Sequence, residues 1–187
     1  GALERQLEKH RAWWNGYYRN SFISIPHPRM ESVYWIQLYK FASMMRRGGP
    51  FCDLMGPWYK STGWPGIWWN LNTQMLYSSL HVSNQMELFS TLPDYLEAHK
   101  GQLIQNIPEQ WRYDAAGISR CTGQDLDESI LTWPNAQSPE RSNLIYLCYY
   151  LWEYYRMTME EAYLSDQLFP LLKRAVNLLL HEVTVDA

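Results

Sequence analysis

The chain has 187 residues, of which 47% are hydrophobic and 19% charged, and its formal net charge is −3. This length suits one main domain, and the composition argues against a disordered chain. No apolar run approaches the ~18 residues of a membrane span and neither sign of charge forms a block, so we expect no membrane and no nucleic acid as partner.

The aromatic content is high, with 10 tryptophans and 14 tyrosines. This exceeds what one core of this size needs for packing, so some rings are expected to face a ligand. The three cysteines Cys52, Cys121 and Cys148 are odd in number and widely spaced, which is not typical of a disulfide framework or a metal knuckle. The histidines form no HExxH pair and the chain carries no GxGxxG, P-loop or GxSxG motif, so no metal and no cofactor is predicted.

Hydrophobic spacing predicts two helices in the first quarter of the chain. The first runs over residues 2–20 and is ended by the prolines that follow. The second runs over residues 29–47 and is closed by Gly48-Gly49-Pro50. A connection rich in glycine, proline and aromatic residues then spans 48–67, and connections of this length in compact domains are usually functional.

The rest of the chain is also predicted to be helical, apart from one long loop. Helices are expected over 72–84 and 85–99, with Pro93 marking a restart, and a short helical turn is expected over 102–112. Residues 113–141 lose the helical period and read as a second long loop, in which short strands are compatible with the pattern.

The last third is predicted to contain a helix over residues 142–157 and a final long helix after Asp166 that tolerates Pro170 in its opening turn. Between them, Thr158-Met159-Glu160-Glu161 reads as a capping box that starts a new helix. The sequence therefore predicts an all-α, double-layered fold of about seven helices, with the long aromatic loops gathered at one end.

The most distinctive stretch runs from Trp64 to Gln74. Pro65-Gly66 favours an extended backbone, in which side chains two residues apart share a side. Asn70 and Asn72 would then present two amides on one side, flanked by indole rings, and could bind sugar hydroxyls or orient a water molecule. The alternative is that one asparagine only caps the helix that follows.

Several stretches resemble the catalytic domain of glycoside hydrolase family 95, the inverting α-L-fucosidases and α-L-galactosidases. They are Trp69-Asn70-Leu71-Asn72-Thr73-Gln74-Met75, the preceding Gly56-Pro57-Trp58 and Tyr34-Trp35-Ile36-Gln37-Leu38-Tyr39-Lys40, and the helix pair within residues 143–173. The resemblance implies an (α/α)6 toroid of twelve helices with its active site at a mouth formed by long loops. Seven helices are too few, so residues 1–187 are expected to form about half of this catalytic domain.

The resemblance also implies roles for individual residues. Asn70 and Asn72 would help to hold the water that attacks the anomeric carbon, with a downstream aspartate as general base. The general acid, a glutamate in a Ser-Pro-Glu context, would follow the helix that ends near His181, so both carboxylates are expected beyond Ala187 and the fragment alone is expected to be inactive. Ser138-Pro139-Glu140 has these letters but precedes the helix pair, and we interpret it as a turn.

The expected substrate is a carbohydrate, held by an aromatic wall. Its candidate members are Trp58, Tyr59, Trp64, Trp68 and Trp69, together with Gln74 as a polar contact. At least half of these rings are expected to fill only the core beneath the loop. Leu76-Tyr77-Ser78 departs from the fucosidase pattern, so the resemblance leaves the identity of the sugar open.

Two further expectations concern the chain as a molecule. A half-toroid would expose the apolar faces of its helices, which predicts self-association. The resemblance also implies a secreted or periplasmic protein, although this chain begins with no signal peptide. The alternatives are a non-catalytic helical carbohydrate-binding or scaffold module, and a helical interaction protein whose aromatic side chains are all core.

Overall fold

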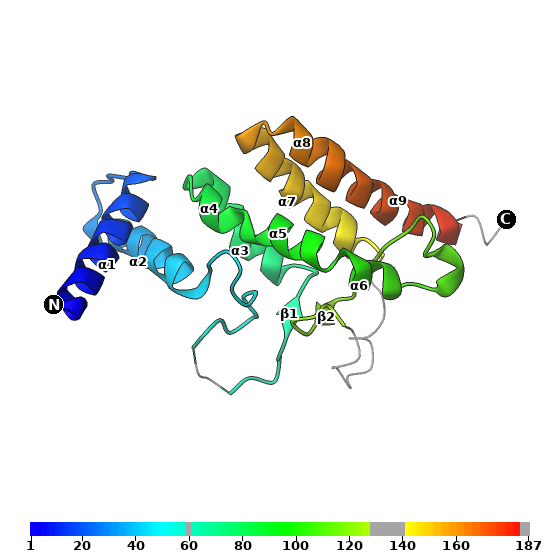
Figure 1. The fold of residues 1–187 in the computed structure, drawn as a ribbon, viewed down its shortest axis with the longest axis horizontal. Coiled ribbons are helices and arrows are strands. Elements are labelled where there is room, and N and C mark those ends of the chain that lie inside the picture. The colour runs from blue at the N-terminus through cyan, green and yellow to red at the C-terminus, as the bar shows by residue number, and fades with distance from the viewer. Residues whose placement is uncertain (59–60, 128–140, 184–187) are drawn as a thin grey trace.

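The computed structural model describes residues 1–58, 61–127 and 141–183. Within this part the chain is all-α, as predicted, with two very short strands (Figure 1). The helices are α1 (Ala2–Arg19), α2 (Pro28–Met44), α3 (Asn72–Val82), α4 (Met86–Phe89), α5 (Thr91–Ala98), α6 (Lys100–Gln105), α7 (Asn143–Thr158), α8 (Glu161–Tyr163) and α9 (Phe169–Val183). The strands are β1 (Ile67–Trp68) and β2 (Cys121–Thr122), and a 3-10 turn, η1, covers Glu109–Trp111.

Helices α1 and α2 form a hairpin at one end of the molecule (Figure 1). Both were predicted, and α2 begins at Pro28 because the Nδ1 atom of His27 accepts a hydrogen bond from the Met30 amide, 3.3 Å away. Aromatic side chains join the two helices: the ring of Trp14 stacks on that of Tyr39 at 5.1 Å. The hairpin is therefore held by rings rather than by an aliphatic core.

The main core lies between two rows of helices. Helices α3 to α6 follow one another along one row, and α7 packs on α3 and on α9 to form the other (Figure 1). Side chains from both rows are fully buried between them, among them Leu80, Leu92 and Leu147. This two-row packing confirms the predicted double-layered arrangement and places the loops before α3 and after η1 on one side.

The helix expected over 85–99 is two helices, α4 and α5, which meet at Ser90. Pro93 lies in the first turn of α5, where its missing amide costs nothing, so the predicted restart is confirmed. Splits of this kind make the helices of the described chain shorter and more numerous than the seven expected.

The capping box predicted at Thr158 is wrong. Thr158 is the last residue of α7, and Met159 follows in the left-handed conformation with φ of 55°. The Glu161 carboxylate accepts a hydrogen bond from the Tyr155 hydroxyl at 2.7 Å instead of closing a cap. Helix α8 accordingly starts at Glu161 without a side-chain cap, because Thr158 belongs to the last turn of α7.

Helices α8 and α9 are continuous through a π-helical turn, η3 (Leu164–Leu168), so the last helix begins earlier than predicted. The turn directly precedes Pro170, the second residue of α9. A proline has no amide to donate, and in a regular helix its ring would clash with the carbonyl of Asp166, four residues earlier. The wider π turn accommodates this proline without breaking the helix.

The two long loops meet where β1 pairs antiparallel with β2, with Ile67 opposite Thr122 and Trp68 opposite Cys121. Gly66 precedes β1 with φ of 93°, and a Cβ atom there would lie 2.8 Å from the Cys121 sulfur. Glycine is needed at this position because a side chain would both strain the backbone and push the strands apart. The backbone leading to Asn70 is thus fixed by a loop more than fifty residues away.

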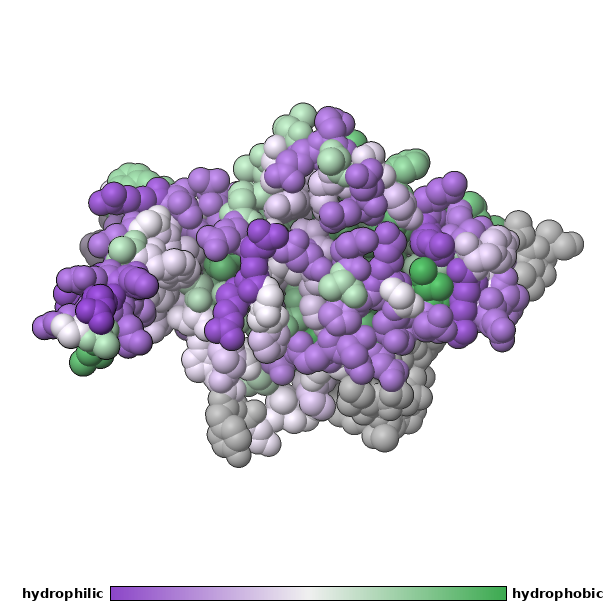
Figure 2. Space-filling view, viewed as in Figure 1, coloured by the Kyte–Doolittle hydropathy of each residue, from purple (hydrophilic) through white to green (hydrophobic). Residues whose placement is uncertain are grey.

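Apolar side chains remain exposed on several helices. Ile36 on α2, Tyr149 on α7 and Leu180 on α9 are each at least half exposed, and apolar residues lie scattered among polar ones on the face in Figure 2. Across the described ranges, no helix combines the length and apolar character that a membrane crossing requires.

Candidate functional site

One cleft brings together Trp58, Trp68 and Asn72, three of the predicted site residues. Its volume is about 410 Å³, and we call it the Asn72 cleft. The end of α2 forms one wall, residues 52–58 form another, and β1 and the first turn of α3 close it. Three successive segments within residues 37–76 therefore line one cleft.

The extended backbone predicted for Asn70 and Asn72 is wrong, because residues 69–71 form a turn and α3 begins at Asn72. Asn72 is exposed and lines the cleft, whereas Asn70 is half-buried in the turn beside it. The capping alternative is not formed either: the N-cap of this described helix is Leu71, and no side chain caps it.

Side chains from the start of α3 fasten this turn. The Thr73 hydroxyl donates to the Trp68 carbonyl at 2.9 Å, and the Gln74 amide donates to the Trp69 carbonyl. Both Thr73 and Gln74 are buried. Side chains of α3 thus hold the turn that carries Asn70 and that leads into this helix.

Trp69 and Gln74 were expected to touch substrate, and the structure places both in the core. Trp69 is fully buried: its indole nitrogen donates to the Thr122 hydroxyl at 2.8 Å, and its amide donates to the Arg120 carbonyl at 2.8 Å. Its ring stacks on Phe51 with 5.3 Å between centroids. Neither side chain has exposed surface that could contact a sugar, so both belong to the core beneath the cleft.

Trp58 and Trp64 lie closer to the surface, whereas Trp68 is buried, with 5% of its surface exposed. Trp58 is 46% exposed and folds over Gly56, where a Cβ atom would lie 2.9 Å from its ring. Trp64 is 54% exposed, and its ring lies 4.9 Å from that of Trp68, tilted by 48°. Trp58 therefore presents a partly exposed ring to the cleft, Trp68 lines it as a buried residue, and Trp64 packs against the Trp68 ring. Tyr59 and Ser138-Pro139-Glu140 lie outside the described residues.

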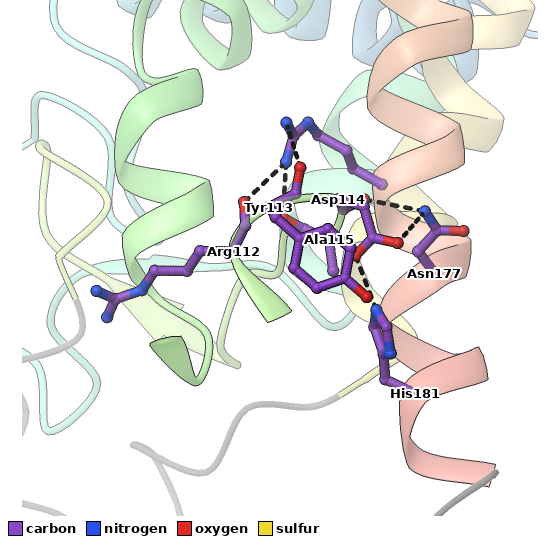
Figure 3. A network of polar contacts seen from close by, with 7 residues as sticks. Arg112, Tyr113, Asp114, Ala115, Asn177 and His181 are labelled. Carbon is purple, nitrogen blue, oxygen red and sulfur yellow. Dashed lines mark hydrogen bonds and ion pairs between the residues drawn. The ribbon is translucent and has the colours of Figure 1, made fainter. Parts of the chain in front are cut away.

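The cleft carries charge of both signs. Lys40 lines it from α2 and Asp53 from the loop, where the Asp53 carboxylate accepts a hydrogen bond from the Met55 amide at 2.9 Å. Two other acids of the described chain have structural partners: Asp94 of α5 pairs with Arg47 at 2.8 Å, and Asp114 of the loop after η1 pairs with His181 at 2.7 Å (Figure 3). In the part of the chain that the structure covers, no three His, Cys, Asp or Glu side chains gather in a way that could hold a metal ion.

Cys52 lines the same cleft, and burial together with the charge of Asp53 raises the pKa of its thiol to about 11. Burial likewise raises the pKa of Cys121 to about 11 and that of Cys148 to about 12. Each thiol is thus held in its protonated, weakly nucleophilic form at neutral pH. A nucleophilic cysteine is not part of this site.

We expect the native protein to react slowly with a chromogenic disulfide reagent at pH 8, because the thiolate is the reactive form. Cys52, which is only partly buried, should react first, ahead of the buried Cys121 and Cys148. Thiol titration with and without denaturant checks this, and all three thiols should react at once in the unfolded chain. Rapid reaction of Cys121 or Cys148 in the native protein would contradict the raised pKa values.

Comparison with known proteins agrees with the geometry. The model of the glycosyl hydrolase family 95 catalytic domain matches residues 28–187, which include the cleft and both rows of helices. The chain is also similar to alpha-L-fucosidase 2 of Arabidopsis thaliana, with 26% identity over 161 residues that make up 81% of this chain and 18% of that protein. The chain thus spans less than a fifth of the length of this relative. It belongs to glycosyl hydrolase family 95, within whose catalytic domain the cleft lies.

Proposed function

We propose that these residues form part of a glycoside hydrolase that removes a terminal sugar from a glycan with inversion, in the manner of an α-L-fucosidase. Residues 1–187 would contribute about half of an (α/α)6 toroid. The observation that carries the proposal is the position of Asn72, which lines a cleft walled by Trp58 and Trp68. The family assignment and the similarity to a protein named as a fucosidase support the reaction class.

In the proposed mechanism, the exposed Trp58 ring stacks against the C–H face of the sugar, and the buried Trp68 lines the cleft beside it. The Asn72 amide, with that of Asn70 in the adjoining turn, holds the attacking water, since an amide offers both donors and an acceptor. Orienting the water in this way lowers the entropic cost of the attack.

Inverting hydrolysis also needs two carboxyl groups about 6.5–9.5 Å apart. Among the described residues that line the cleft, Asp53 supplies a single carboxylate. We therefore propose that the general acid and base come from other parts of the protein, and that the 187 residues alone do not turn over substrate. We further propose a secreted or periplasmic location, and self-association of the isolated chain through its exposed apolar helix faces.

The single carboxylate also favours a second candidate, a helical module that binds carbohydrate without cleaving it. Both candidates predict that this chain binds sugar. They differ in whether the full-length protein hydrolyses it. Hydrolysis of an aryl glycoside by the full-length protein supports the enzyme, whereas sugar binding without hydrolysis supports the module.

Asn72→Ala is the direct test of the site. We expect its affinity for L-fucose or L-galactose to fall about tenfold, since about 1.4 kcal/mol of hydrogen bonding to the sugar and its water is lost. Titration calorimetry measures this, with Asn15→Ala, an exposed asparagine of α1, as the matched control. Equal affinities of the two variants would contradict the role of Asn72, and absence of binding in the unmodified chain would contradict the site itself.

A further inference from the structure

Four sulfur-bearing side chains line the Asn72 cleft, and two of them are in contact. They are Met44 at the end of α2, Cys52 and Met55 in the loop that follows, and Met75 on α3. The Cys52 thiol donates toward the Met44 thioether, with 3.6 Å between the two sulfur atoms. The chain has eight methionines and three cysteines, so about a third of its sulfur atoms lie at this one cleft. The proposed hydrolysis uses none of them.

The distance between the Cys52 and Met44 sulfurs has the dimension of a metal site. With the metal–sulfur bond of about 2.3 Å known for zinc thiolates, two sulfurs at a tetrahedral angle on one ion lie about 3.8 Å apart. The observed 3.6 Å is close to this value. One ion in the place of the thiol proton therefore contacts both sulfurs after only a small movement of two half-buried side chains.

The Trp58 ring lies on another side of the Cys52 thiol. Gly56 has a φ of 64°, and a Cβ atom there would lie 2.9 Å from the Trp58 ring and 3.7 Å from the Cys52 sulfur. The ring and the thiol thus flank the same backbone position, which only glycine leaves open. An indole ring attracts cations through its π electrons, so Trp58 adds a third soft group beside the two sulfurs.

The types of ligand select the class of metal. Thiolate and thioether groups are soft ligands that favour Cu(I), whereas zinc sites are built from cysteine, histidine and carboxylate groups. Within the described ranges no three His, Cys, Asp or Glu side chains come together. The sequence motifs indicated no metal for the same reason, because they contain no thioether and this pair spans a helix end and a loop.

The pair is also within reach of an ion from solvent. Met44 and Cys52 line the Asn72 cleft and, beside it, a second cavity of about 460 Å³. The buried thiols of Cys121 and Cys148 line neither. A monovalent cation bound to a thiolate forms a neutral pair, so the charges of Lys40 and Asp53 in the same cleft stay balanced.

We propose that Cys52 and Met44 bind one Cu(I) ion beside the Trp58 ring. On binding, the S–H bond of Cys52 breaks and its proton passes to solvent, a Cu–S bond forms in its place, and the Met44 sulfur donates a lone pair. Copper remains Cu(I) throughout, so the step needs no oxidant or reductant. The site is independent of the proposed function, since sugar hydrolysis requires neither sulfur.

Competition for Cu(I) against bicinchoninate tests the proposal on the unmodified chain without oxygen, followed by the absorbance of the copper–chelator complex. Cys52→Ser removes the thiol, and Met44→Leu removes the thioether while keeping its volume. The matched controls are Met30→Leu, an exposed methionine on the same helix, and Cys148→Ala, a buried thiol on α7. Zn²⁺ is titrated in parallel.

We expect one tightly bound Cu(I) per chain. Its affinity should fall at least a hundredfold in Cys52→Ser and at least tenfold in Met44→Leu, and it should stay within about twofold in both controls. An unchanged affinity in Met44→Leu would show that the thiol acts alone and would overturn the paired site. Loss of binding in Cys148→Ala would place the ion elsewhere, and tighter binding of Zn²⁺ than of Cu(I) would overturn the class of metal.

Discussion

Trp69→Ala is expected to lower the free energy of unfolding by about 3–5 kcal/mol, the cost typical of deleting a large core aromatic side chain. The Trp69 side chain is fully buried and stacks on Phe51, and its loss also leaves the Thr122 hydroxyl without its indole donor. For a chain of this length the melting temperature should fall by roughly 6–20 °C. Thermal unfolding followed by circular dichroism measures the change.

Two further variants make this prediction specific. Trp69→Phe keeps a ring in the stack but removes the donor to Thr122, so its loss of stability should be intermediate, and it remains measurable if the alanine variant does not fold. Trp58→Ala, which truncates a ring that is 46% exposed, should cost less than about 1 kcal/mol. A melting temperature of Trp69→Ala equal to that of Trp58→Ala would show that Trp69 is not a core residue.

The helices could be predicted because each depends on local signals. The apolar stripes, the helix-ending residues Gly48-Gly49-Pro50 and the helix-starting Pro93 each act within one or two helical turns, and the helices of the structure agree with them. The failure at Thr158 is also local, but there two helix ends compete for one threonine. A capping pattern does not reveal which end takes the hydroxyl.

The candidate site depended on contacts that no local pattern contains. Trp68 and Trp69 are neighbours with similar chemistry, yet one lines the cleft and the other fills the core. Their positions are set by the pairing of β1 with β2, and Thr122, the partner of Trp69, lies in β2 within a stretch whose sequence shows no helical period. The resemblance pointed to the asparagine stretch, and Asn72 lines the cleft, whereas the spacing argument gave the stretch the wrong backbone because residues 69–71 form a turn that leads into α3 at Asn72.

A second region of the described chain depends on polar contacts that the sequence did not suggest. The loop after η1 is tied to α9 by a network in which Arg174 donates to the carbonyls of Arg112 at 3.2 Å, Ala115 at 3.1 Å and Tyr113 at 3.4 Å. Asn177 donates to Asp114 (Figure 3). The loop thus has no regular structure of its own and takes its shape from one face of a helix about sixty residues later.

Arg174→Met should therefore lower the free energy of unfolding by about 2–4 kcal/mol, because three backbone carbonyls lose a charged donor at once while the methylene packing of the side chain is kept. Lys173→Met is the matched control: Lys173 is exposed on the same helix, so its replacement should change stability by less than about 0.5 kcal/mol. Urea unfolding gives both values.

Hydrogen exchange separates loss of this network from a general loosening of the fold. The Ala116 amide donates to the Arg174 carbonyl at 3.2 Å, and the next amide, that of Gly117, donates to the Leu103 carbonyl at 2.9 Å. In Arg174→Met these two amides should lose protection well before the amides at the centre of α7, because the loop detaches while the helix rows stay packed. Equal loss of protection in α7 and at Ala116 would mean that the arginine stabilises the whole core and not the loop.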